Sequence, residues 1–231
     1  MFTHTRSLFA LFMAVGLVAV GGCTHSPSAA HDAASDHEKH DSLPLPKRLA
    51  FMTGHVEAGL ALYRAGEPTM AAQHLEHPVS ETHASERVGL DALGFDAERF
   101  IAVSNALAKG LKANEIEPQL LAAQQNLAMV STRAGGDTTE VIDFLLDTIV
   151  EEYAIGVQGG AVTDPGEYQD AFGFTVVAIN RAQDYREPKR SRVIDRLKKL
   201  LATWPSAPVP PANPAPPQDI NRLVDDVRSA L

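Results

Sequence analysis

Cysteine, tryptophan and long apolar runs are scarce in this chain. Its 231 residues include one Cys and one Trp, and aromatic residues make up 6%. A single cysteine excludes a disulfide within the chain, and it excludes the paired cysteines that attach haem. The longest apolar run, residues 8–20, is too short to span a bilayer comfortably as a helix. Multi-span transport is therefore excluded.

Histidine is absent from the whole chain after position 83. The nine histidines are His4, His25, His31, His37, His40, His55, His74, His77 and His83. The formal net charge is -9 at pH 7, which argues against electrostatic binding of nucleic acid and favours cations as partners. An uneven histidine distribution in an acidic chain directs attention to metal ions.

Familiar catalytic patterns are also missing. The chain has no serine-centred nucleophile elbow, no HExxH and no phosphate loop. We therefore expect no enzyme, no catalytic residue and no organic cofactor. A hydrolase that uses Glu152 and Glu167 as paired carboxylates is a remote alternative.

The N-terminus carries the pattern of an exported protein. A short basic start and an apolar core predict a signal peptide over residues 1–22. The tetrapeptide VGGC that ends at Cys23 resembles the lipobox of bacterial lipoproteins. This resemblance implies that Cys23 is lipidated and anchors the mature protein in the membrane. Because Thr24 rather than Asp follows it, the resemblance implies the periplasmic side of the outer membrane. The alternative is an ordinary secreted protein with a lone thiol.

Composition divides the rest of the chain into four parts. Residues 23–46 are rich in Ser, Ala, Asp and His and poor in large apolar side chains, which predicts a disordered tether. Residues 47–204 show helical periodicity and predict one helical domain. Residues 205–217 hold seven of the 15 prolines and predict a stiff linker. An amphipathic helix is expected over residues 218–231, docked or free.

The predicted fold class is an all-α bundle of about seven short helices. Glycine pairs, prolines and N-cap residues mark the boundaries of the helices. After an N-terminal hairpin, the expected helices are residues 80–93, 96–109, 117–134, 138–157, 165–182 and 191–204.

The hairpin GLALYRAGEPTMAAQHL resembles one tetratricopeptide repeat. Tyr63, Gly66 and Ala71 stand at matching places. No second copy follows at a 34-residue period, so a repeat array is not expected.

Histidines and methionines gather on this hairpin. Met70, His74 and His77 stand at i, i+4 and i+7, and Met52 and His55 stand at i and i+3, so each set shares one helical face. Thioether with imidazole suits copper(I). The alternative is that the methionines fill gaps in the core and that a histidine caps a helix end.

Oxygen ligands near the hairpin would favour a harder ion such as iron or zinc. The candidates that could join the imidazoles are Glu57, Glu76, Glu81 and His83. The tether segment 31–41 offers a second, looser site with three histidines and four acids, and its alternative is a merely polar linker.

The segment EEYAIGVQGGAVTDPGEYQDAFGF joins two acidic and aromatic stretches through a glycine-rich turn. It resembles a helical extracytoplasmic segment of the high-affinity iron permease family, over roughly residues 150–185. The resemblance implies an accessory, periplasm-facing helical domain concerned with iron or a similar cation, with Glu152 and Glu167 as matching carboxylates. The membrane helices of the permease are absent, so transport itself is not implied. The alternative is that Asp164 caps a helix, Glu167 is a favourable charge in its first turn, and Tyr153 and Tyr168 pack in a helix interface.

Together these patterns predict a lipid-anchored periplasmic protein that binds one iron or copper ion and assists a membrane metal-transport protein. The candidate ligands are Met52, His55, Met70, His74, His77, His83, Glu152 and Glu167. The alternative is a tetratricopeptide-like scaffold of the cell envelope that has no metal site.

Overall fold

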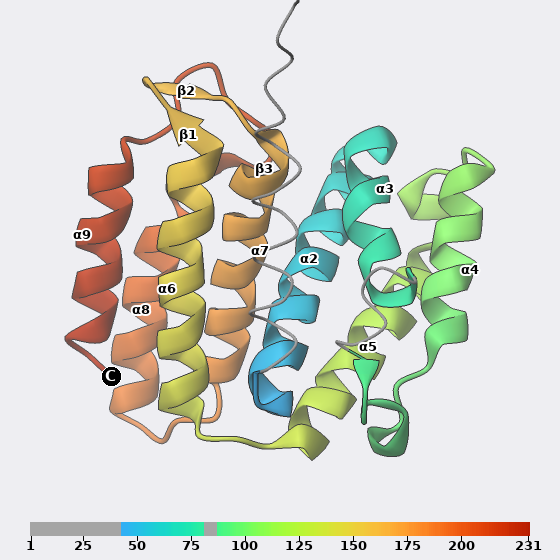
Figure 1. Cartoon of the computed structure of the whole chain (residues 1–231), viewed down its shortest axis with the longest axis horizontal. Coiled ribbons are helices and arrows are strands. Elements are labelled where there is room, and N and C mark those ends of the chain that lie inside the picture. Colours follow the sequence, from blue (N-terminus) through green and yellow to red (C-terminus); the bar gives the residue numbers. More distant parts are fainter. Residues whose placement is uncertain (1–42, 81–86) are drawn as a thin grey trace, which may run out of the picture.

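The computed structural model describes residues 43–80 and 87–231. The predicted signal peptide, the predicted lipidation site Cys23, the tether histidines and His83 lie outside the described residues. The predicted all-α class is confirmed (Figure 1). The helices of the described chain are α2 (Leu45–Ala65), α3 (Pro68–Glu76), α4 (Ala97–Ala108), α5 (Glu117–Ala134), α6 (Thr138–Gly156), α7 (Pro165–Ala182), α8 (Lys189–Leu201) and α9 (Pro217–Arg228).

Short elements join these helices. Single 3-10 turns are His77–Val79, Asp91–Leu93 and Ala113–Glu115. The α6–α7 connection contains a two-residue antiparallel hairpin of β1 (Val157–Gln158) and β2 (Ala161–Val162), and β3 (Pro205–Pro208) lies in the proline-rich segment.

One predicted helix, residues 80–93, is wrong in its described part. Residues 87–93 form turns and 3-10 structure, including the segment Asp91–Leu93, and no α-helix. Gly89 has a positive φ of 88°, and that left-handed backbone interrupts a right-handed helix. Gly94 lies just past the predicted end, where its φ of 89° ends the 3-10 segment. Asp96 precedes α4 as expected, but its carboxylate accepts from Arg99 Nε at 2.8 Å and makes no cap bond.

Helix caps fix the start of α6 and α7. Asp137 accepts from the Glu140 N–H at 2.9 Å, and Asp164 accepts from the Gly166 N–H at 2.9 Å. These bonds satisfy amides that have no partner within the helix. The cap role proposed for Asp164 is therefore confirmed.

The apolar side chains form two cores. The C-terminal core joins α6, α7, α8 and α9, and the N-terminal core joins α2, α3, α4 and α5. In Figure 1 the first group lies on the left and the second on the right, with α2 and α7 side by side between them. Helix α9 packs on α6 and α8 and buries Ile220, Val224 and Val227, so the C-terminal helix is docked.

Helix α2 belongs to both cores because it is apolar on opposite faces. Ala50 and Phe51 enter the C-terminal core, whereas Leu49, Met52 and Val56 enter the N-terminal core. A helix that is buried on opposite sides does not have the broad polar face that a surface helix turns to water. Helix α2 is therefore the central element of the fold.

Helices α2 and α7 cross with their backbones almost in contact. A Cβ atom at Gly173 would lie 2.0 Å from the Gly54 carbonyl oxygen, and one at Gly54 would lie 2.1 Å from the Phe174 ring. Only glycine permits this approach. The crossing brings residues near position 55 of α2 beside residues near position 170 of α7.

No helix in the described part of the chain is both long enough and apolar enough to cross a membrane.

Candidate metal centre

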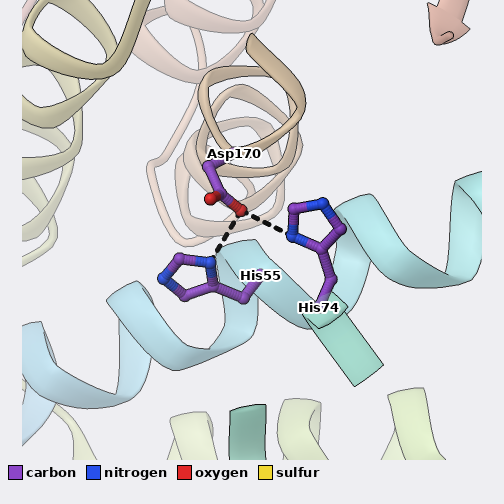
Figure 2. Close-up of side chains that lie close together, drawn as sticks. All are labelled: His55, His74 and Asp170. Atoms are coloured by element: carbon purple, nitrogen blue, oxygen red, sulfur yellow. Dashed lines mark hydrogen bonds and ion pairs between the residues drawn. The ribbon is translucent and has the colours of Figure 1, made fainter. Parts of the chain in front are cut away.

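Asp170 accepts hydrogen bonds from two imidazoles at the α2–α7 crossing. Its Oδ1 lies 2.6 Å from His55 Nδ1 and 2.9 Å from His74 Nδ1. Figure 2 shows the carboxylate between the two rings, which come from α2 and α3. A carboxylate can only accept, so both Nδ1 atoms carry the proton in this arrangement.

The three side chains are buried. The His74 and Asp170 residues are 4% and 7% exposed, and the His55 side chain is 12% exposed. Burial alone would raise the pKa of Asp170, but the charges and hydrogen bonds of His55 and His74 lower it well below its usual value. Burial likewise lowers the pKa of His74, but Asp170 and Gln169 outweigh it and the pKa is raised. The cluster therefore holds an anionic carboxylate.

Gln169 extends the network on the other side of His74. Its Oε1 lies 2.8 Å from His74 Nε2, and its Nε2 donates to Met70 Sδ at 3.1 Å. Two consecutive residues of α7 thus contact both ring nitrogens of His74. Met70 joins the network through this amide.

His77 lies against His55 in a ring stack. The centroids are 4.1 Å apart with an angle of 16° between the planes, and Phe51 and Phe174 contact the His55 ring edge-on. His77 lies outside the group of His55, His74 and Asp170, whose donor atoms are close enough to share one ion. The Nε2 atom of His55 is buried and has no hydrogen-bond partner among the described residues.

Glu152 and Glu167 form a second, half-buried group near the cluster. Burial raises the pKa of Glu152, and the hydrogen bond with Glu167 and repulsion from Glu167 and Asp170 raise it further. Two carboxyls that share a hydrogen bond must share a proton. Glu167 also contributes to the raised pKa of His74.

The structure brings together some of the predicted ligands and separates others. His55, His74 and His77 are neighbours. Met70 is linked to His74 only through the side chain of Gln169. Met52 is fully buried in the N-terminal core. Glu152 and Glu167 lie outside the group of three donors that could share one ion.

Asp170 was not among the predicted ligands, although the EYQD motif contains it. It is a charged residue on a face of α7 that otherwise carries the buried Phe174 and Val177. A charged residue whose neighbours at i+4 and i+7 are apolar core residues is expected to be buried with them, and a buried charge needs a partner. This pattern was the available indication.

The donor atoms suit a divalent transition metal. One ligand atom each from His55, His74 and Asp170 lies within 4.8 Å of the other two. The two nitrogen–oxygen distances, 2.6 and 2.9 Å, are those of the hydrogen bonds, and an ion bound to all three atoms would replace the two Nδ1 protons. Two imidazoles and one carboxylate that leave open positions form the ligand set of non-haem iron(II) sites.

Comparison with known proteins finds a family match for the C-terminal part of the chain. Residues 134–231 match the family described as the iron permease-associated 4-helix bundle domain. Neither a curated protein nor a solved structure matches the chain. The match covers α6 to α9, including Asp170, and leaves out the two histidines of the cluster. The resemblance to the extracytoplasmic segment of iron permease proteins is therefore confirmed.

Proposed function

We propose that this protein binds one divalent transition-metal ion between α2, α3 and α7 as an accessory to metal uptake. The observation that carries the proposal is the convergence of His55 Nδ1, His74 Nδ1 and Asp170 Oδ1 from three helices. The match to an iron permease-associated domain supports a role in metal uptake.

The donor set favours iron(II) or zinc(II) over copper(I). Copper(I) prefers thioether and thiolate sulfur. Met52 is fully buried in the N-terminal core, and the Met70 sulfur accepts a hydrogen bond from Gln169. Nitrogen and oxygen are the ligands left, and the matched family makes iron the first candidate.

The protein acts without catalysis, by binding the ion and presenting it to a membrane metal-transport protein. A lipid anchor at Cys23 would hold it at the periplasmic side of the outer membrane, with residues 24–46 as a tether. This part of the proposal depends on the lipobox pattern VGGC.

A metal titration tests the proposal. A chain that begins at Thr24 lacks the predicted signal peptide and Cys23 but keeps every described residue. It is titrated with iron(II) without oxygen, with zinc(II) and with copper(I). We expect one tightly bound iron or zinc ion per chain, and a loss of at least about a hundredfold in affinity in His74→Ala.

Gln73→Ala is the matched control because Gln73 is the exposed neighbour of His74 on α3. The tether histidines are present in both variants, so loose binding there cancels. If the wild-type chain binds no stoichiometric ion, or if both variants bind alike, the metal function is wrong and the envelope scaffold becomes the better hypothesis.

A further inference from the structure

We propose that Gln169 determines which ligand atoms this centre offers, and so its choice of metal. It holds His74 with Nδ1 toward the ion and keeps the Met70 thioether away from it. This inference rests on the proposed metal function and deepens it. In this account Gln169 is a positioning residue that acts through His74 and Met70.

Gln169 is a polar side chain in the interior of the protein. The residue is only 1% exposed, and a buried amide is costly unless its oxygen and nitrogen are both satisfied. The oxygen lies 2.8 Å from His74 Nε2, and the nitrogen lies 3.1 Å from Met70 Sδ. The amide therefore bridges two candidate ligands.

The chemistry of sulfur fixes the orientation of the amide. A thioether can accept a hydrogen bond but cannot donate one, so the NH₂ end of Gln169 faces Met70. The carbonyl end then faces His74, and Nε2 of His74 must carry a proton to donate to it. The nitrogen left for an ion is Nδ1, which lies 2.9 Å from Asp170 Oδ1 and would release its proton to solvent when the ion binds.

Without the amide, a different donor pair would become available. Met70 and His74 stand one turn apart on α3 and so share a helical face. Once Gln169 no longer engages them, the thioether and His74 Nε2 are both free to bind. Sulfur with imidazole suits copper(I), whereas two Nδ1 atoms with a carboxylate suit iron(II) or zinc(II).

The variant Gln169→Leu tests the inference because leucine has a similar volume and no hydrogen-bonding group. In the chain from Thr24, we expect its zinc(II) affinity to fall by about 10- to 100-fold, the usual effect of losing a partner that orients a ligand. We expect its copper(I) affinity to be retained or increased. Met70→Leu in the Gln169→Leu background should lower copper(I) affinity relative to Gln169→Leu alone.

The nitrogen that binds the ion is measured without any variant. In the zinc-loaded wild-type protein, the ring ¹⁵N resonances of His74 should show a protonated Nε2 and a metal-bound Nδ1. Circular dichroism checks that Gln169→Leu is folded. If this variant does not fold, the ring resonances of the wild-type protein still show which nitrogen of His74 binds zinc.

Two failures are distinguishable. If the wild-type chain binds neither zinc(II) nor iron(II), the proposed metal function is wrong, and this inference is wrong with it. If the wild-type chain binds zinc through His74 Nε2, or if folded Gln169→Leu keeps its zinc affinity within threefold, only the role of Gln169 is overturned.

Discussion

The two halves of the molecule are built differently. In the C-terminal bundle, α6, α7, α8 and α9 follow one another as neighbours, and α9 closes the ring on α6. In the N-terminal half, α2 to α5 are joined partly by turns and 3-10 segments. The family match covers the regular half, whereas two of the three candidate metal donors come from the other half.

The candidate metal site needs residues from both halves of the molecule. The bundle supplies Asp170 and Gln169 on α7, and the N-terminal half supplies His55 on α2 and His74 on α3. An ion bound by all three donors would tie the two halves together. The absence of histidine after position 83 fits this division, because the candidate ligand from the bundle is the carboxylate of Asp170.

The largest effect is expected at the helix crossing that joins the halves. Gly173→Ala would place a Cβ atom 2.0 Å from the Gly54 carbonyl oxygen, which cannot move without moving α2. We expect the free energy of unfolding to fall by at least about 3 kcal/mol, measured by urea denaturation.

The control for Gly173→Ala is Gly66→Ala. Gly66 has a φ of 85° and no atom within 4 Å of the added Cβ, so only backbone strain of about 1–2 kcal/mol is expected. Equal losses in the two variants would show that the crossing is not tightly packed.

A cavity in one core tests whether the halves unfold together. Leu127 is 1% exposed in the N-terminal core, and Leu127→Ala should cost about 2–5 kcal/mol. Trp204 is the single tryptophan and lies in the C-terminal core. Because α2 enters both cores, we expect Trp204 fluorescence and circular dichroism to report the same lowered midpoint. A Trp204 midpoint that stays at the wild-type value would show that the halves unfold separately.

Zinc should stabilise the folded protein by mass action. At a free zinc concentration of 100 times the dissociation constant, the free energy of unfolding should rise by about 2.7 kcal/mol. Asp170→Asn removes the anionic donor between the two imidazoles, so zinc should no longer stabilise it. Chelation should return the wild-type protein to its metal-free stability, and equal zinc stabilisation of both proteins would contradict the assignment.

A smaller effect is expected on the surface of the bundle. Arg228 on α9 pairs with Asp143 and Asp147 on α6. Exposed ion pairs contribute little, so Arg228→Ala should cost at most about 1 kcal/mol, and less in high salt. Thermal melts at low and high ionic strength measure this, and a loss that is independent of salt would point to packing instead.

The smallest effect concerns Glu57, whose pKa is raised by burial despite a hydrogen bond from Gln124 and the charge of Arg64. A raised folded-state pKa means that its favourable contribution is complete below the unfolded pKa and is lost as the pH rises through the folded pKa. Glu57→Gln should therefore gain stability relative to wild type as the pH rises from 4 to 7. A difference that does not change with pH would exclude this cause.

Local patterns predicted the helices better than the site. The helices 117–134 and 165–182 were predicted at their observed bounds, because Pro, Gly-Gly and an Asp cap are signals read from adjacent residues. The prediction of a helix over residues 80–93 was wrong in its described part, because the sequence pattern did not reveal the positive φ of Gly89 inside it.

The site depends on contacts that no local spacing reveals. Met70 and His74 share a helical face, so their proximity was predictable. His55 and Asp170 are 115 residues apart and meet only because Gly54 and Gly173 let α2 and α7 touch. Side chains brought together by a helix crossing are specified by packing, which sequence periodicity does not contain.

The most direct test of the central claim is anomalous diffraction from a crystal of the zinc-loaded protein. We predict one strong peak at about 2.0–2.2 Å from His55 Nδ1, His74 Nδ1 and Asp170 Oδ1, between the two halves. A zinc-loaded crystal whose anomalous peaks all lie elsewhere, with the Asp170 hydrogen bonds intact, would contradict the account.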